Sequence, residues 1–334
     1  MKDITIIVPV YNAENTIERC LASFISNKDQ IYEVILVDDR STDNAFDKIE
    51  PFKQYFNIRV LENEGNKGPG PARKTGILAA ESEWITFVDA DDCLTPSSLY
   101  YVQKELLDSN ALLLHSMTIY YENGNFVKEN VEHSDGSCGG NFYRRKYLTL
   151  NNLLPHEELF MAEDEYFNNI VMRYIATYEG EDYIQRYDYP VYEVHHDTDD
   201  GKSFSFSNWV EYICKYHLLS AYYEAEFFSF DQDLRYEMFE RLCDSFMFGF
   251  YASEGLIQDE RVNVNIIELT EVFLDIAQKY KNTFNIQAED LIRYYETERT
   301  ARRGIYNAVS LSIGFEPEKT RSFRHFVKTL YKNI

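Results

Sequence analysis

The sequence predicts an α/β fold, a doubly wound and mainly parallel sheet with helices on both faces, followed by a helical C-terminal part. Four short apolar runs alternate with segments of helical spacing over the first hundred residues. Polar residues follow the end of each run, and strand-like patterns disappear after about residue 206. Alternating strands and helices are typical of a parallel sheet that is covered on both sides.

The four runs are rich in β-branched residues and almost continuously apolar, as strands are when both faces of their sheet are buried. They are ITIIVPV (4–10), YEVILVDD (32–39), NIRVLEN (57–63) and WITFVDA (84–90). Segments with helical spacing lie between them, at roughly 14–27, 43–54 and 70–81. Each connection is longer than the ~10–12 residues that a parallel crossover needs, so we expect the order β-α-β-α-β-α-β.

The remaining chain divides into an extension of this sheet and a helical tail. A helix at 97–108, a strand at 111–121 and short elements up to 189–196 are expected to continue the sheet. Apolar and aromatic residues then recur at i, i+3 and i+4 in four segments, 208–226, 232–254, 265–281 and 287–307. We therefore expect one domain at 1–205, with halves 1–96 and 97–205, and a helical domain at 206–334.

Composition excludes several classes of protein. The 33 Lys and Arg residues face 56 Asp and Glu residues, and the net charge of −23 would repel a nucleic-acid backbone. The five cysteines are odd in number and form no CxxC pair, as in proteins with reduced thiols. No segment approaches the ~18 apolar residues of a membrane span. We expect a soluble, cytoplasmic enzyme that does not bind nucleic acid.

Polar residues follow each of the four expected strands. Tyr11, Asn12 and Glu14 follow the first strand, Asp38, Asp39 and Asp43 the second, Asn66, Gly68 and Arg73 the third, and Asp89, Asp91 and Asp92 the fourth. Ligands of open α/β sheets bind outside the carboxyl ends of the strands. We therefore expect these four clusters to meet at one edge and to form a binding site.

The acids after the fourth strand indicate a cation site. If the chain is still extended there, Asp89 and Asp91 point to one side and Asp92 to the other. Two carboxylates on one side suit Mg²⁺ or Mn²⁺, which also bind water and ligand phosphate. The alternative is a solvated acidic turn before the next helix.

These segments also carry a resemblance to a known family. VPVYNAEN, VDDRSTD, ENEGNKGPGPARKTGI and FVDADD, in this order and spacing, resemble the nucleotide-sugar-binding half of family 2 glycosyltransferases, which have the Rossmann-like GT-A fold. GNFYRRKYL (140–148) and FMAEDEYFNN (160–169) resemble the acceptor-side segments of that family. The resemblance covers about residues 1–200. It implies inverting, metal-dependent transfer of a sugar from a nucleotide diphosphate sugar, most simply UDP-linked, to a hydroxyl of a glycan, glycoprotein or lipid-linked acceptor.

The resemblance implies donor contacts for Pro9, Tyr11, Glu14, Asp39, Asn66, Arg73, Asp89 and Asp91. The first three would border the nucleoside, and the carboxylate of Asp39 would accept a hydrogen bond from an N–H of uracil. The Arg73 guanidinium would lie near the phosphates or the base. Asp89 would contact ribose or the cation, and Asp91 would bind the diphosphate through Mn²⁺ or Mg²⁺. The family usually has Asn where this chain has Lys74.

The resemblance also implies the catalytic base. Inverting transfer needs a group that removes the proton of the acceptor hydroxyl, and by similarity this is Asp164, with Glu163 as the competing candidate. A solvated acidic helix face is the structural alternative. His195 or His196 would be another metal ligand, or else a loop histidine. Arg144 and Arg145 remain open between a phosphate contact and a surface position.

The C-terminal segment 316–334 has a basic amphipathic pattern. Two placements remain open, one on the inner face of an anionic membrane and one against the acidic body of this chain or of a second copy bound through 206–334. Two rival functions also remain. A scaffold subunit with this fold would be expected to lack the metal or base acids, and a nucleotidyltransferase would normally show a basic Gly-rich loop after the first strand, where VPVYNAEN has none.

Overall fold

A computed structural model describes residues 4–107, 109–130 and 137–196, and the short pieces 216, 219–220, 222–228, 275–276, 278–279 and 282–283. The chain forms two compact units, Met1–Ser203 and Phe204–Ile334. Most of the four helices expected after residue 206, and the whole segment 316–334, lie outside the described residues. Among the described helices none is long and apolar enough to cross a membrane.

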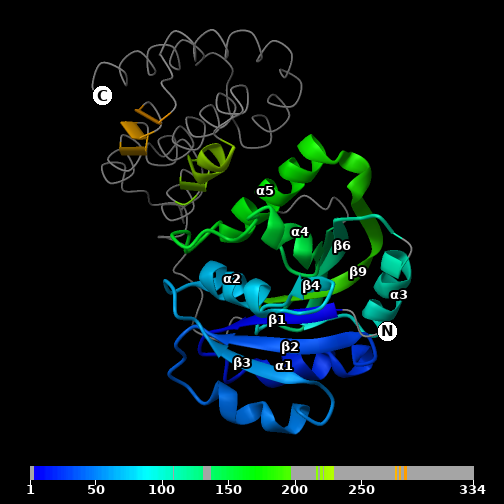
Figure 1. Cartoon of the computed structure of the whole chain (residues 1–334). Coiled ribbons are helices and arrows are strands. Elements are labelled where there is room, and N and C mark those ends of the chain that lie inside the picture. Colours follow the sequence, from blue (N-terminus) through cyan, green and yellow to red (C-terminus); the bar gives the residue numbers. More distant parts are fainter. Residues whose placement is uncertain are drawn as a thin grey trace. The chain divides into compact units, whose positions relative to one another are not determined.

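The first half of the sheet confirms the expected parallel arrangement. Its strands are β1 (Ile4–Val10), β2 (Ile31–Asp38), β3 (Ile58–Glu62) and β4 (Trp84–Phe87). They lie in the order β3-β2-β1-β4, and every neighbouring pair is parallel (Figure 1). Because the strands run in the same direction, their carboxyl ends lie at one edge of the sheet.

The second half continues the same sheet with mixed directions. It contains β5 (Cys93–Leu94), β6 (Leu113–Glu122), β7 (Asn125–Asn130), β8 (Phe142–Arg144) and β9 (Ile184–His196). Strand β8 is antiparallel to both β4 and β6, so it joins the two halves. Beyond β6 come β9, which is parallel to it, and β5, while β7 pairs with the outer part of β6. The described residues thus form one nine-stranded sheet.

Helices cover both faces of the sheet. On one face α1 (Ile17–Ser23) and α3 (Ser98–Leu107) contribute to the core that includes Ile6 and Val8 of β1. On the other face lie α2 (Pro69–Ala79) and α5 (Glu163–Tyr178), with α4 (Arg145–Leu150) after β8. A Cβ atom at Gly76 of α2 would lie 2.3 Å from the Cγ2 atom of Ile7, so this helix packs directly on β1.

Two expectations about local structure are wrong. The segment 43–54 forms two 3₁₀ turns, η2 (Ala45–Lys48) and η3 (Glu50–Phe52), because Pro51 has no N–H with which to continue a helix. Further 3₁₀ turns are η1 (Ile25–Asn27) and η4 (Glu181–Tyr183). Strand β4 ends at Phe87, and the Asp92 N–H donates to the Asp89 carbonyl at 3.0 Å. Asp89 and Asp91 therefore lie on a turn, not on an extended strand.

Candidate active site

The loops after β1 and β2 are tied together at the carboxyl edge of the sheet. The Thr42 N–H donates to the side-chain oxygen of Asn12 at 2.7 Å, and the Asn44 side-chain amide donates to the Glu14 carboxylate at 3.4 Å. The ring of Tyr11 is 44% exposed, with the Lys67 ammonium 3.7 Å from its centroid. An exposed ring beside a cation at this edge can face a nucleotide.

Asp39 holds the beginning of α2. Its carboxylate is buried and accepts hydrogen bonds from the Asn63 side-chain amide at 2.7 Å and from the Gly68 N–H at 2.8 Å. Gly68 has a φ of +138°, a conformation that side chains rarely adopt. A carboxylate oxygen can accept a second hydrogen bond, so contact with a base remains compatible with these bonds. Pro9 lies on β1 opposite Val37 of β2, and the next residue, Val10, accepts a hydrogen bond from the Asp39 N–H at 2.8 Å.

Arg73 joins two carboxylates that lie far apart in the sequence. Its side chain is only 6% exposed, and it donates to the Glu163 carboxylate at 2.6 Å and to the Asp89 carboxylate at 2.8 Å. Asp89 was expected on the donor side and Glu163 on the acceptor side. A planar guanidinium has separate N–H groups for two partners, so this one residue fixes the distance between the two groups of acids.

Small residues and a second ion pair bring α2 close to α5. A Cβ atom at Gly70 would lie 3.2 Å from the Cβ of Glu163, so glycine leaves room for this acid. The Asn66 side-chain amide donates to the Glu157 carbonyl at 3.2 Å, and the Lys74 ammonium pairs with the Glu157 carboxylate at 2.6 Å. The loop after β3 is thereby attached to the segment that precedes α5.

The three acids after β4 have different environments. Asp91 is exposed, and the Asp89 side chain is 41% exposed. Asp92 is buried and accepts hydrogen bonds from the Tyr192 hydroxyl at 2.6 Å and from the His195 backbone N–H at 2.9 Å. Burial and the charges of Asp89 and Asp91 raise the pKa of Asp92, against its two hydrogen bonds. Asp92 therefore stabilises the turn, while Asp89 and Asp91 face the open edge.

The residues present fit a hard divalent cation at this edge. One oxygen of the Asp89 carboxylate accepts from Arg73, and the other has no hydrogen bond within the described residues. The exposed Asp91 carboxylate lies on the same turn and could be the second ligand. Two carboxylates with open coordination positions suit Mg²⁺ or Mn²⁺, which bind substrate phosphate in the remaining positions.

Glu163 and Asp164 form the first turn of α5, directly after Ala162, whose φ is +56°. Burial raises the pKa of Glu163 to about 7, with a further rise from the Asp164 charge and an opposing effect of Arg73. Burial also raises the pKa of Asp164, again against Arg73. Glu163 is held by its ion pair, whereas the Asp164 carboxylate is bound by local backbone N–H groups, with the Glu165 N–H at 2.9 Å. Asp164 is the acid with the more available carboxylate.

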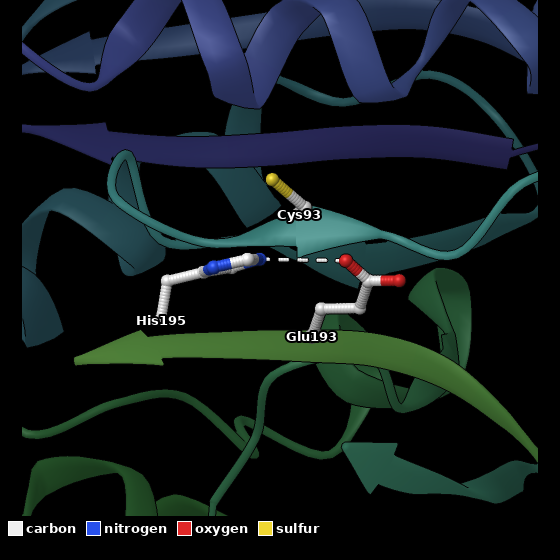
Figure 2. Close-up of side chains that lie close together, drawn as sticks. All are labelled: Cys93, Glu193 and His195. Atoms are coloured by element: carbon white, nitrogen blue, oxygen red, sulfur yellow. Dashed lines mark hydrogen bonds and ion pairs between the residues drawn. The ribbon is translucent and has the colours of Figure 1, made fainter. Parts of the chain in front are cut away.

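The structure places the His195 ring in a different group of side chains. The ring is stacked on Tyr121, with centroids 5.0 Å apart, and its Nε2 atom lies 3.4 Å from the Glu193 carboxylate. Figure 2 shows these two residues together with Cys93. Within the described part of the chain, the ring and ion-pair contacts of His195 include neither Asp89 nor Asp91. The His196 side chain lies outside what the structure describes.

The two arginines after β8 have structural partners. The Arg144 guanidinium pairs with Glu83, donates to the Ala111 carbonyl at 3.0 Å and covers the Trp84 ring at 4.8 Å. Arg145 donates to the Ser82 carbonyl at 3.2 Å. Trp84 begins β4, so both arginines lie at the strand end opposite to Asp89. These partners and this position favour the surface alternative over a phosphate contact.

Two residues that position the site were not expected from the sequence. Asn63 bonds to Asp39, and Tyr192 accepts a hydrogen bond from the Asp89 N–H at 3.2 Å while donating to Asp92. A Cβ atom at Gly139 would lie 2.6 Å from the Tyr192 ring, so the absence of a side chain at Gly139 makes space for this ring. That glycine was the one signal in the sequence, since a tyrosine in an apolar strand resembles any core residue.

Comparisons with known proteins agree with this geometry. The model of the family "Glycosyl transferase family 2" matches residues 5–170. The chain is 31% identical to the minor teichoic acid biosynthesis protein GgaA of Bacillus subtilis, over 53% of this chain and 45% of that protein. It is 30% identical to the poly(ribitol-phosphate) beta-N-acetylglucosaminyltransferase TarS of Staphylococcus aureus, over 50% of this chain and 32% of that protein. The matched region thus spans less than half the length of these relatives.

Solved structures show the same fold. S. aureus TarS residues 1–349 in complex with UDP-GlcNAc superpose with a TM-score of 0.58 and 20% identity, over 90% of this chain and 92% of that chain. At this identity the match establishes the α/β GT-A fold alone. The family model, which matches residues 5–170, shows that this chain belongs to glycosyl transferase family 2, and the sheet order agrees with that assignment.

Proposed function

We propose that this chain is an inverting, metal-dependent glycosyltransferase that moves a sugar from a UDP-sugar to a hydroxyl of a glycan, glycoprotein or lipid-linked acceptor. The observation that carries the proposal is the Arg73 side chain, which bonds to Asp89 and Glu163 and so holds the expected donor and acceptor acids side by side. The relatives named above act in teichoic acid biosynthesis and on poly(ribitol-phosphate). A cell-wall polymer hydroxyl is the acceptor class that we favour.

The site has separate residues for the uracil and for the diphosphate of the UDP-sugar. The Asp39 carboxylate accepts a hydrogen bond from uracil, beside the Tyr11 ring. Asp89 and Asp91 would hold a divalent cation, whose positive charge would stabilise the diphosphate as a leaving group. Pro9, Glu14 and Asn66 shape the loops around the nucleoside. These donor roles stay predictions for this chain.

Asp164 removes the proton from the acceptor hydroxyl. The acceptor oxygen then forms a bond to the anomeric carbon on the face opposite UDP, while the bond from that carbon to the UDP oxygen breaks. UDP leaves with the electron pair, and the configuration at the anomeric carbon inverts. Glu163 keeps Arg73 in place, because its carboxylate is already engaged in the buried ion pair and is less available to an acceptor hydroxyl.

Calorimetric titration of the full chain with UDP, in the presence and in the absence of Mn²⁺, tests the donor site. CDP and GDP are the controls for base recognition. We expect binding of UDP alone, dependent on Mn²⁺, and loss of that binding in Asp91→Asn. Absence of nucleotide binding under every condition would favour the scaffold function over the enzyme.

Transfer assays on the Asp164→Asn protein test the base. We expect unchanged UDP affinity and a transfer rate lower by about 10²–10⁴-fold, the usual contribution of a positioned base. Glu165→Gln, which removes a neighbouring acid of the same helical turn, is the matched control and should keep its activity. Full transfer by Asp164→Asn would reject this assignment.

A further inference from the structure

Three side chains with metal-binding atoms meet where β5 pairs with β9. Glu193 and His195 are two residues apart on β9 and therefore project from the same side of that strand. Cys93 of β5 lies directly opposite Glu193 in the antiparallel ladder, which places its side chain on that side too. The cysteine sulfur, a Glu193 oxygen and a His195 ring nitrogen lie within 4.8 Å of one another (Figure 2).

We propose that Cys93, Glu193 and His195 hold a zinc-class divalent cation, at a site distinct from the hard-cation site of Asp89 and Asp91. Thiolate and imidazole ligands select zinc over Mg²⁺ and Mn²⁺, which prefer oxygen. The assignment gives His195 a role other than the one expected at the Asp89–Asp91 cation. It does not depend on the proposed transferase activity.

The geometry is close to that of a bound cation. Zinc bonds of about 2.0–2.3 Å place the ligand atoms of a tetrahedral site about 3.3–3.6 Å apart. The His195 Nε2 atom and the Glu193 Oε2 atom are already 3.4 Å apart. A shift of about 1 Å by the Cys93 side chain completes a three-ligand site, in which water takes the fourth position.

The ligands are shielded and held in place. Cys93 is 5% exposed, and the side chains of His195 and Glu193 are 13% and 19% exposed. Tyr121 lies flat against the His195 ring, at an interplanar angle of 7°, and fixes its orientation. Burial raises the pKa of the Cys93 thiol to about 11, so binding of the cation would release the thiol proton, and the resulting thiolate and the Glu193 carboxylate would balance the charge of a divalent cation.

The site would stabilise the donor edge. The backbone N–H of His195 and the hydroxyl of Tyr192, both on β9, donate to Asp92 in the turn that carries Asp89 and Asp91. Cys93 follows Asp92 directly on the other side of that turn. A cation that links β5 to β9 would therefore stabilise the same end of the turn that the hydrogen bonds to Asp92 already hold.

Cobalt titration of the metal-free, full-length protein tests the proposal, because a thiolate bound to Co²⁺ gives an intense near-ultraviolet charge-transfer band. We expect this band to saturate at one equivalent of Co²⁺ and to disappear when zinc is added. It should be absent in Cys93→Ser, and the cobalt affinity should fall at least about tenfold in His195→Gln and in Glu193→Gln. Cys138→Ser, another buried thiol, is the matched control and should keep the band.

Asp91→Asn separates the two cation sites. It should lose the Mn²⁺-dependent binding of UDP and keep the cobalt–thiolate band. A wild-type protein without the band, or a band that persists in Cys93→Ser, would overturn the proposal. If circular dichroism shows that Cys93→Ser is unfolded, unchanged cobalt affinity in both His195→Gln and Glu193→Gln would overturn it equally.

Discussion

Arg73 is the residue whose loss should disturb the site most, because it is buried and carries the charge that balances Glu163. Arg73→Leu leaves that carboxylate without its cation, and we expect the free energy of unfolding to fall by about 3 kcal/mol, at the low end for a broken buried pair because Glu163 can take up a proton. The double variant Arg73→Leu/Glu163→Leu should recover part of this loss. Urea unfolding of the wild type, of the single variants Arg73→Leu and Glu163→Leu, and of the double variant measures the coupling. Strictly additive losses would mean that the ion pair contributes no stability.

The same buried acids predict how transfer depends on pH. A base must be ionised to accept a proton, and burial raises the pKa of Asp164 above its ordinary value of 3.8. The rate should therefore fall as pH decreases, and this fall should begin at a higher pH than a solvated aspartate would give. The profile of kcat/KM between about pH 4 and 8 measures it. Glu165→Gln should leave the profile unchanged, and a flat profile in the wild type would count against Asp164.

At the scale of elements, the contact between α2 and β1 positions Arg73. In Gly76→Ala the new methyl group would lie 2.3 Å from the Cγ2 atom of Ile7, and backbone or strand must shift. We expect a loss of about 1–3 kcal/mol in the free energy of unfolding, as for other overpacked sites. Thermal or urea unfolding measures it. Gly65→Ala, where the methyl group would meet neighbours at 3.5 Å and 3.8 Å, is the matched control and should unfold nearly like the wild type.

Elements and site differ in how far the sequence predicts them. The parallel strands could be predicted because a strand buried on both faces must be apolar throughout. The position of Asp39, Arg73 and Asp89 at the carboxyl edge could be predicted because ligands of open α/β sheets bind there, while their roles in binding stay predictions. The 3₁₀ turns of segment 43–54 could not be predicted, because the apolar residues of this segment have helical spacing although Pro51 interrupts it. The role of Tyr192 could not be predicted either, because its hydroxyl donates to Asp92, one hundred positions away, only once the sheet has formed.

At the scale of the whole molecule, the expected donor and base residues all lie in the unit Met1–Ser203. We therefore expect a fragment of residues 1–203 to bind UDP and Mn²⁺ with an affinity within a few-fold of that of the full chain, measured by calorimetry. Light scattering on both proteins measures their molar mass, and a change in oligomeric state on removal of residues 204–334 would show that these residues mediate self-association. A folded fragment that fails to bind UDP would show that the C-terminal unit contributes to the donor site.

The antiparallel strand β8 makes the sheet of the N-terminal unit rigid between its two halves. Because it bonds to β4 on one side and to β6 on the other, the segments 4–96 and 97–196 share one continuous ladder of backbone hydrogen bonds. Neighbouring strands in such a ladder are held about 4.8 Å apart. The two segments therefore cannot close on a substrate like a pair of hinged jaws. Substrates must be admitted and enclosed by movements of the loops at the edge, over a floor that stays rigid.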